Sequence, residues 1–156
     1  MIVAMRVDHR LVHGQVAFSW VTAINANCIL AANDDAAHNE IQMTALQLAA
    51  PQGVKVVVKT IAESIQQINS GVTDKYRLLI VVKNVQDAWH LISECKQIKE
   101  LNVAGTNKTD NSEQVTSAVY LTAKDKQELK MLSASGVRVF SQMVPSDKSI
   151  DLIKKL

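Results

Sequence analysis

The sequence predicts an open, doubly wound α/β fold: a mostly parallel sheet of six to seven strands with helices on both faces. Short β-branched runs alternate with amphipathic stretches along the 156 residues, the order typical of strand–helix–strand units. Several runs, such as "LLIVV" at 78–82, are continuously apolar, which favours parallel strands buried on both faces. The chain is too short for a closed barrel of eight units, which takes about 250 residues.

Each expected element follows from a local pattern, and together they indicate a single domain over residues 1–156. The second helix can be capped by Asn33, Asp34 or Asp35 and should end at Pro51 and Gly53. Thr122 can cap the helix expected at 123–134. The expected strands cover residues 2–7, 28–32, 54–59, 77–82, 100–104, 118–121 and 137–143. The expected helices cover 14–25, 36–50, 61–69, 85–94, 123–134 and 147–155.

Composition narrows the function classes. The net charge is only +2 and there is no long basic run, so a nucleic-acid partner is not expected. No apolar run reaches the roughly 18 residues of a membrane span, and the first residues do not resemble a signal peptide. Cys28 and Cys95 stand alone without C-x-x-C spacing, which is typical of reduced packing residues in a cytoplasmic protein.

The stretch "RVDHRLVHGQ" (6–15) gathers charged and titratable groups directly after the first expected strand. Ligands of open α/β sheets bind outside the carboxyl ends of the strands, so this loop lies at the functional edge. His13 precedes Gly14 at the start of the first helix, where free amides and the helix dipole attract anions. Arg10 can bring a guanidinium to the same anion, and Asp8 can orient Arg10 or an imidazole. A histidine in such a cradle is suited to nucleophilic attack on phosphorus.

Other uses of these residues stay open on the sequence alone. His9 and His13 are four residues apart and adjoin Asp8, so they could bind zinc as part of a hydrolase. Arg10 between them argues against a divalent cation, and we expect no metal. A non-catalytic module that senses phosphate could use the same cradle, and His13 could simply pack or cap. No glycine-rich nucleotide motif is present.

The stretch "RVDHRLVHGQV" (6–16) resembles the active-site signature of the IIB components of the mannose/fructose/sorbose class of the bacterial phosphoenolpyruvate-dependent sugar phosphotransferase system. The resemblance covers nearly the whole chain. It is supported by "ANDDAA" (32–37), "APQGVKVVV" (50–58), "LNVAG" (101–105) and the segment 118–147.

The resemblance implies that His13 carries a phosphoryl group on Nδ1, and that Arg10 and the amides around Gly14 and Gln15 hold the phosphoryl oxygens. Asp8 becomes a supporting residue, while His9 falls on a variable position of the motif. The donor would be a IIA domain and the acceptor a sugar held by the membrane IIC/IID transporter, to which a cytoplasmic IIB protein docks transiently. No cofactor is implied.

Three points stay open. Asn33 and Asp34, at the end of the second strand, could line the edge of the pocket or serve only as caps. The family often has Gly-Gly-Met where this chain has 104–106, Ala-Gly-Thr, so the turn there can differ. Overall similarity weakly favours N-acetylgalactosamine as the sugar, and mannose, fructose and sorbose stay open. A homo-oligomer is also among the options.

Overall fold

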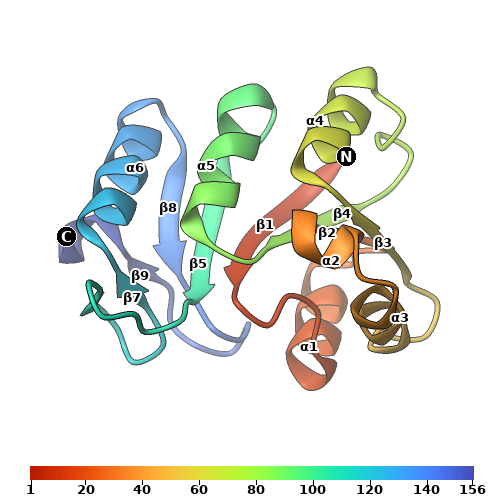
Figure 1. Cartoon of the computed structure of the whole chain (residues 1–156), viewed down its shortest axis with the longest axis horizontal. Coiled ribbons are helices and arrows are strands. Elements are labelled where there is room, and N and C mark those ends of the chain that lie inside the picture. Colours follow the sequence, from red (N-terminus) through yellow and green to blue (C-terminus); the bar gives the residue numbers. More distant parts are fainter.

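The central feature is a seven-stranded sheet in the order β3-β2-β4-β1-β5-β8-β9, seen in a computed structural model that describes all 156 residues except the side chain of Gln15 (Figure 1). Neighbouring strands are parallel except β8 and β9, so the predicted fold class is confirmed. The strands are Ile2–Asp8 (β1), Cys28–Ala32 (β2), Lys55–Lys59 (β3), Leu78–Val82 (β4), Glu100–Gly105 (β5), Arg138–Ser141 (β8) and Ile150–Asp151 (β9).

Helices cover both faces of the sheet. Those on one face are Gly14–Ile24 (α1), Asp34–Ala37 (α2) and Glu40–Leu48 (α3), and those on the other are Ile61–Ser70 (α4), Val85–Glu94 (α5) and Ala123–Ala134 (α6). None of the helices in the described part of the chain has the length and apolar character that a membrane crossing requires.

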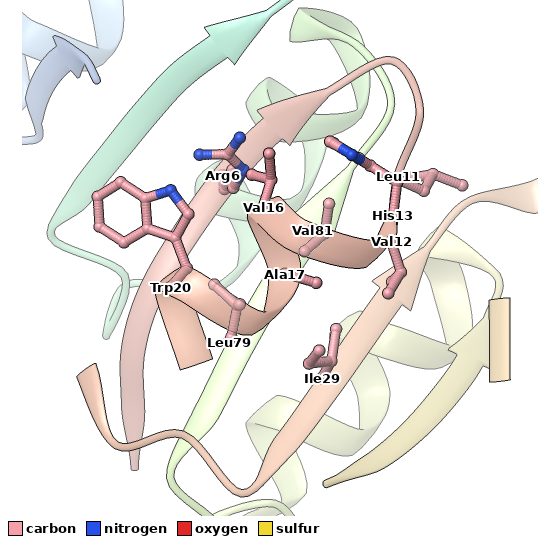
Figure 2. A pocket seen from close by; sticks show the side chains of 10 residues that line it. All are labelled: Arg6, Leu11, Val12, His13, Val16, Ala17, Trp20, Ile29, Leu79 and Val81. Carbon is pink, nitrogen blue, oxygen red and sulfur yellow. The ribbon is translucent and has the colours of Figure 1, made fainter. Parts of the chain in front are cut away.

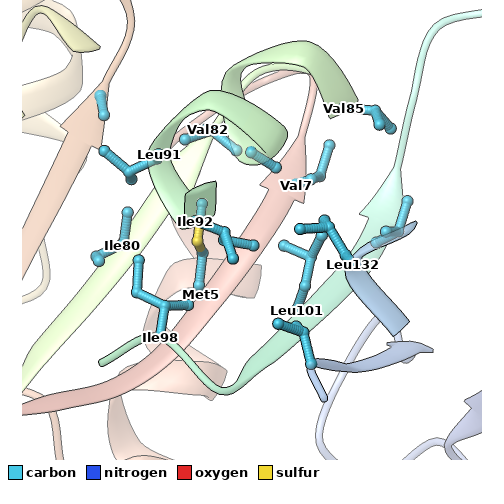
Figure 3. Close-up of a cluster of buried hydrophobic side chains, with 14 of the residues drawn as sticks. Met5, Val7, Ile80, Val82, Val85, Leu91, Ile92, Ile98, Leu101 and Leu132 are labelled. Carbon is cyan, nitrogen blue, oxygen red and sulfur yellow. The ribbon is translucent and has the colours of Figure 1, made fainter. Parts of the chain in front are cut away.

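The sheet separates two hydrophobic clusters because successive side chains of a strand point to opposite faces. On β4, Ile80 packs with the cluster under α4–α6 and Val81 with the cluster under α1–α3. Figure 3 shows the first cluster, to which Met5 of β1, Ile80 of β4 and Leu91 of α5 belong. Burial on both faces explains the continuously apolar strands in the sequence.

Two expected helices differ from the structure. The helix expected at 36–50 is split into α2 and α3, because Asn39 accepts a hydrogen bond from the Gln42 amide (3.0 Å) and starts a new helix. The helix expected at 147–155 is wrong: Ile150 and Asp151 form β9, and a 3₁₀ turn follows at Ile153–Lys155. Pairing of β9 with the free edge of β8 overrides the amphipathic spacing of this segment.

The strand expected at 118–121 is shorter and lies outside the main sheet. Tyr120–Leu121 (β7) pairs antiparallel with Glu113–Gln114 (β6) in a two-stranded ribbon. The ribbon belongs to the polar segment after β5, and the seventh strand of the main sheet is β9 instead. Thr122, directly after the ribbon, caps α6 as predicted: its hydroxyl accepts from the Asp125 amide at 3.1 Å.

Candidate active site

The charged loop leaves β1 at the centre of the sheet, between β4 and β5. Asp8 ends β1, and a turn follows in which the Leu11 amide donates to the Asp8 carbonyl at 2.8 Å. Leu11 has a φ of 58°, a left-handed conformation that costs a non-glycine residue about 1–2 kcal/mol. Its side chain is only 3% exposed, and burying a leucine contributes about 1.5–3 kcal/mol, enough to offset that cost. The buried leucine therefore stabilises the reversal that brings His13 back toward Asp8.

Asp8 is fully buried and is the hub of the loop. Its Oδ2 lies 2.9 Å from His13 Nε2 and accepts from Arg6 Nη2 at 3.1 Å. Its Oδ1 accepts from the Arg10 backbone amide at 3.0 Å and, at 3.4 Å, from Arg10 Nε. One carboxylate thus connects the strand, the turn and the first residue before α1.

The pKa of Asp8 reflects opposing effects. Burial alone raises the pKa, but the hydrogen bond from His13, the bond from the Arg10 amide and the charge of Arg6 together outweigh it. The net pKa therefore lies below the ordinary value for aspartate. A carboxylate that stays ionised at neutral pH is a strong acceptor for a ring N–H.

Arg6 is the neighbour that sequence reasoning left without a role. It is 4% exposed, and burial lowers its pKa while Asp8 opposes that shift. Arg6 Nη1 also donates to the Met143 carbonyl (3.1 Å), which accepts from Trp20 Nε1 as well (2.8 Å). Figure 2 shows the Arg6 guanidinium beside the Trp20 ring, 5.6 Å from its centroid. The sequence did contain a signal for the contact between Arg6 and Asp8. Arg6 stands two residues before Asp8 in an otherwise apolar strand, and residues i and i+2 of a strand point to the same face of the sheet.

The His13 ring has one engaged nitrogen and one available nitrogen. Because Asp8 is an ionised acceptor, the neutral ring carries its proton on Nε2, and the lone pair is on Nδ1. The side chain is 24% exposed, so the ring is accessible at the surface. The hollow that His13 lines with Arg6, Trp20 and apolar side chains holds only about 10 Å³, the volume of one water (Figure 2). A sugar does not fit there.

The start of α1 beside the ring is open. His13 is the N-cap residue of α1 and makes no side-chain cap bond, and Gly14 is exposed with nothing within 4 Å of where a Cβ would be. The Arg10 side chain is 47% exposed, and in the described part of the chain its Nη groups have no hydrogen-bond partner. Arg10 and His13 both bond to the Asp8 carboxylate, so a cationic side chain and the first turn of the 11-residue α1 lie close to the ring. The role predicted for Gln15 rests on its backbone amide in the first turn of α1, and its side chain lies outside the described part of the structure.

Residues 2–156 match a family model described as the PTS system sorbose subfamily IIB component. The chain belongs to this IIB family. Components of the family are phosphotransferases that take a phosphoryl group from IIA and pass it to a sugar, working with IIC and IID.

Named relatives have different sugars in their names. The chain is 31% identical to an N-acetylgalactosamine-specific phosphotransferase enzyme IIB component of Escherichia coli K12, over 99% of this chain and 98% of the relative. It is 32% identical to the mannose-specific EIIAB component of the same strain, over 97% of this chain but 48% of that longer protein. The IIB domain of the sorbose permease from Klebsiella pneumoniae has the same fold, with a TM-score of 0.94, 31% identity and coverage of 99% and 95% of the two chains.

Asn33 and Asp34 lie at the end of β2, two strands away from the charged loop that follows β1. Their polar side-chain atoms bond to other parts of the chain and not to this loop. Asn33 caps α2 by accepting from the Ala36 amide (2.9 Å), and its amide donates to Asp87 (3.4 Å). Asp34 accepts from the Ile61 amide at 2.9 Å, which connects α2 to the start of α4. Asn33 is therefore a cap of α2, whereas Asp34 lies in the first turn of α2 and bonds to α4 instead of capping its own helix.

The Ala-Gly-Thr segment fits its surroundings. Ala104 is buried inside β5 without a positive φ, and the Gly105 carbonyl accepts from the His9 amide at 3.1 Å. Thr106 Oγ1 donates to the Tyr120 carbonyl and accepts from its amide, both at 2.7 Å. The threonine thereby connects the end of β5 to the β6–β7 ribbon.

Asp8→Asn tests the hub. The substitution leaves the buried Arg6 charge without its partner, which is expected to lower the free energy of unfolding by about 3 kcal/mol at pH 7. Because folding lowers the pKa of Asp8, its contribution is present above the ordinary aspartate value near about 4 and is lost as pH falls through the folded-state pKa. Urea unfolding between pH 7 and pH 3 should show a smaller acid loss in the variant than in the wild type.

Asp35→Asn is the matched control, since Asp35 is exposed at the start of α2. It should change the free energy of unfolding by less than about 0.5 kcal/mol. If Asp8→Asn behaved like this control in both stability and acid profile, Asp8 would not be the hub of the loop.

Proposed function

We propose that His13 accepts the phosphoryl group on Nδ1 and passes it on from there. The observation that carries this proposal is the 2.9 Å contact between His13 Nε2 and the buried Asp8 carboxylate. This contact supports a proton on Nε2 and a held ring, in which the Nδ1 lone pair is the nucleophile.

The reaction has two balanced steps. His13 Nδ1 attacks phosphorus on the phosphohistidine of IIA, so the new P–N bond forms as the donor's P–N bond breaks and its imidazole leaves. A sugar hydroxyl then attacks the same phosphorus, the bond to His13 breaks, and the hydroxyl proton is released. Asp8 stabilises the positive charge that develops on the His13 ring as Nδ1 bonds to phosphorus, and the ring becomes neutral again when the phosphoryl group leaves.

Arg10, Gly14 and Gln15 stabilise the negative charge of the phosphoryl oxygens. The exposed side chain of Arg10 supplies a planar fork, and the backbone amides of Gly14 and Gln15 supply donors at the positive end of α1. Phosphoryl transfer depends mostly on such positioning and electrostatics.

The shallow site indicates how substrates reach it. The hollow beside His13 holds about 10 Å³, too little for a sugar, which agrees with IIA as donor and a sugar held by IIC and IID as acceptor. We propose that residues 1–156 act as one cytoplasmic domain that docks transiently on the transporter. N-acetylgalactosamine as the transported sugar stays a prediction, and uptake assays with each sugar after gene deletion would test it.

Phosphoryl labelling tests the acceptor directly. With phosphoenolpyruvate and the upstream relay proteins, intact-mass analysis should find one added acid-labile phosphoryl group in the wild type and in His9→Ala, and none in His13→Ala. Retention in His9→Ala is expected because the hydrogen bond to the Gly105 carbonyl comes from the His9 backbone amide, which the substitution keeps. Labelling that persists in His13→Ala would show that His13 is not the phosphoryl acceptor. An unlabelled wild type would favour the phosphate-sensing alternative.

Gly14→Ala tests whether the space above the helix start is used by the phosphoryl group. Apart from the neighbouring residues and the backbone of α1, no atom of the described residues lies within 4 Å of the added Cβ, and alanine favours a helix over glycine by about 0.5–1 kcal/mol, so stability should be unchanged or raised. The rate of phosphoryl uptake should nevertheless fall, by roughly tenfold or more, because the methyl group displaces the oxyanion. Thermal unfolding and single-turnover labelling of the same variant separate the two effects, and an unchanged rate would contradict the proposed cradle.

A further inference from the structure

The free edge of the sheet at β3 has a defined set of unpaired backbone groups. The Lys55 amide donates to the Asn27 carbonyl (3.1 Å), and the Lys59 carbonyl accepts from the Asn33 amide (3.0 Å). Residues of a strand alternate in the side on which they bond, so Lys55, Val57 and Lys59 face β2. The N–H and C=O groups of Val56 and Val58 therefore face outward, and in the described part of the chain no strand pairs with them.

A groove of about 540 Å³ runs along this edge. Met43 of α3 lines one side of the groove, and Gln67 of α4 with Tyr76 lines the other. Figure 1 shows β3 as the outermost strand between α3 and α4. The edge is thus accessible along a trough, and it is separated from the His13 loop by β2 and β4.

The groove carries positive charge. Lys55, Lys59 and Lys75 line it, and no aspartate or glutamate is among its described lining residues. Lys55 and Lys75 lie over the Tyr76 ring, 5.5 and 5.3 Å from its centroid, which holds two of the ammonium groups beside the strand. The carboxylate of Glu63, near Lys59, is engaged by the Thr60 capping box of α4.

The same lysines disfavour a second copy of this chain. If two β3 strands paired antiparallel over all five residues, Val56 would face Val58 of the other copy, and Lys55 would face its Lys59. Directly opposed like charges destabilise a strand pair, and here the two-fold symmetry produces two such pairs. Edge lysines of this kind prevent self-association while leaving the backbone groups available.

We propose that the β3 edge binds an extended, acidic segment of a partner protein by strand addition. The segment has carboxylates four residues apart, opposite Lys59 and Lys55, with β-branched residues between them. The backbone of the segment pairs antiparallel with Val56 and Val58, and its carboxylates give specificity by pairing with the lysines of the edge. The surface is an addition to the phosphoryl site and uses none of its residues.

The probe that tests this is the peptide acetyl-Glu-Val-Thr-Val-Glu-amide with a fluorophore, titrated with the unphosphorylated protein. Fluorescence anisotropy should show saturable binding. N-methylation of the two peptide valines should abolish binding because it removes the N–H groups that face β3. Replacing both peptide glutamates by lysine should abolish it by charge repulsion.

Protein variants locate the contact. Lys55→Gln with Lys59→Gln should weaken binding roughly tenfold, since two cross-strand charge pairs are lost. Lys154→Gln with Lys155→Gln is the matched control, because it removes the same charge from two exposed lysines in the C-terminal turn and should leave binding unchanged.

Four results would overturn the proposal: no binding of the acidic peptide, equal binding of the N-methylated peptide, equal weakening by both double variants, or a dimer through β3 in sedimentation. His13 labelling is measured separately, so loss of the peptide site would leave the phosphoryl-transfer proposal untouched.

Discussion

The structure of the loop depends on a single buried carboxylate. Asp8 has no exposed surface, yet it bonds to the strand through Arg6, to the turn through the Arg10 amide and to the start of α1 through His13. An unpaired charge in that position would cost several kcal/mol, so the loop is stable only in the conformation that supplies all of these partners. Stability and orientation of the nucleophile therefore have the same physical origin.

This hub also explains why distant parts of the chain meet beneath the loop. Arg6 requires acceptors beyond Asp8, and it finds the carbonyl of Met143, 137 residues later in the sequence. Trp20 donates to the same carbonyl and stacks near the guanidinium, so α1 is attached at its middle as well as at its N-terminus. The segment after β8 thereby supports the site without contributing a reactive group.

The extent to which sequence predicts this molecule differs from element to element. Continuously apolar runs identify β2 and β4 because strands buried on both faces need them. The charged stretch identifies the site because charges after a central strand lie at the ligand-binding edge. The left-handed Leu11 and the Arg6–Met143 bond could not be predicted, because the first needs tertiary burial and the second joins residues that no local pattern relates. The C-terminal β9 was missed for the same reason, since its partner is another strand's free edge.

The ring nitrogens of His13 are where the mechanism can be tested most directly. Nitrogen-15 NMR of the histidine-labelled protein, before and after phosphoryl transfer, assigns the proton and the phosphorus to individual atoms. With Nε2 bonded to Asp8, the neutral His13 ring should carry its proton on Nε2, and the phosphorylated protein should show phosphorus coupled to Nδ1. A proton on Nδ1 in the free protein, or phosphorus on Nε2 after transfer, would contradict the role of Asp8 as the residue that orients the nucleophile.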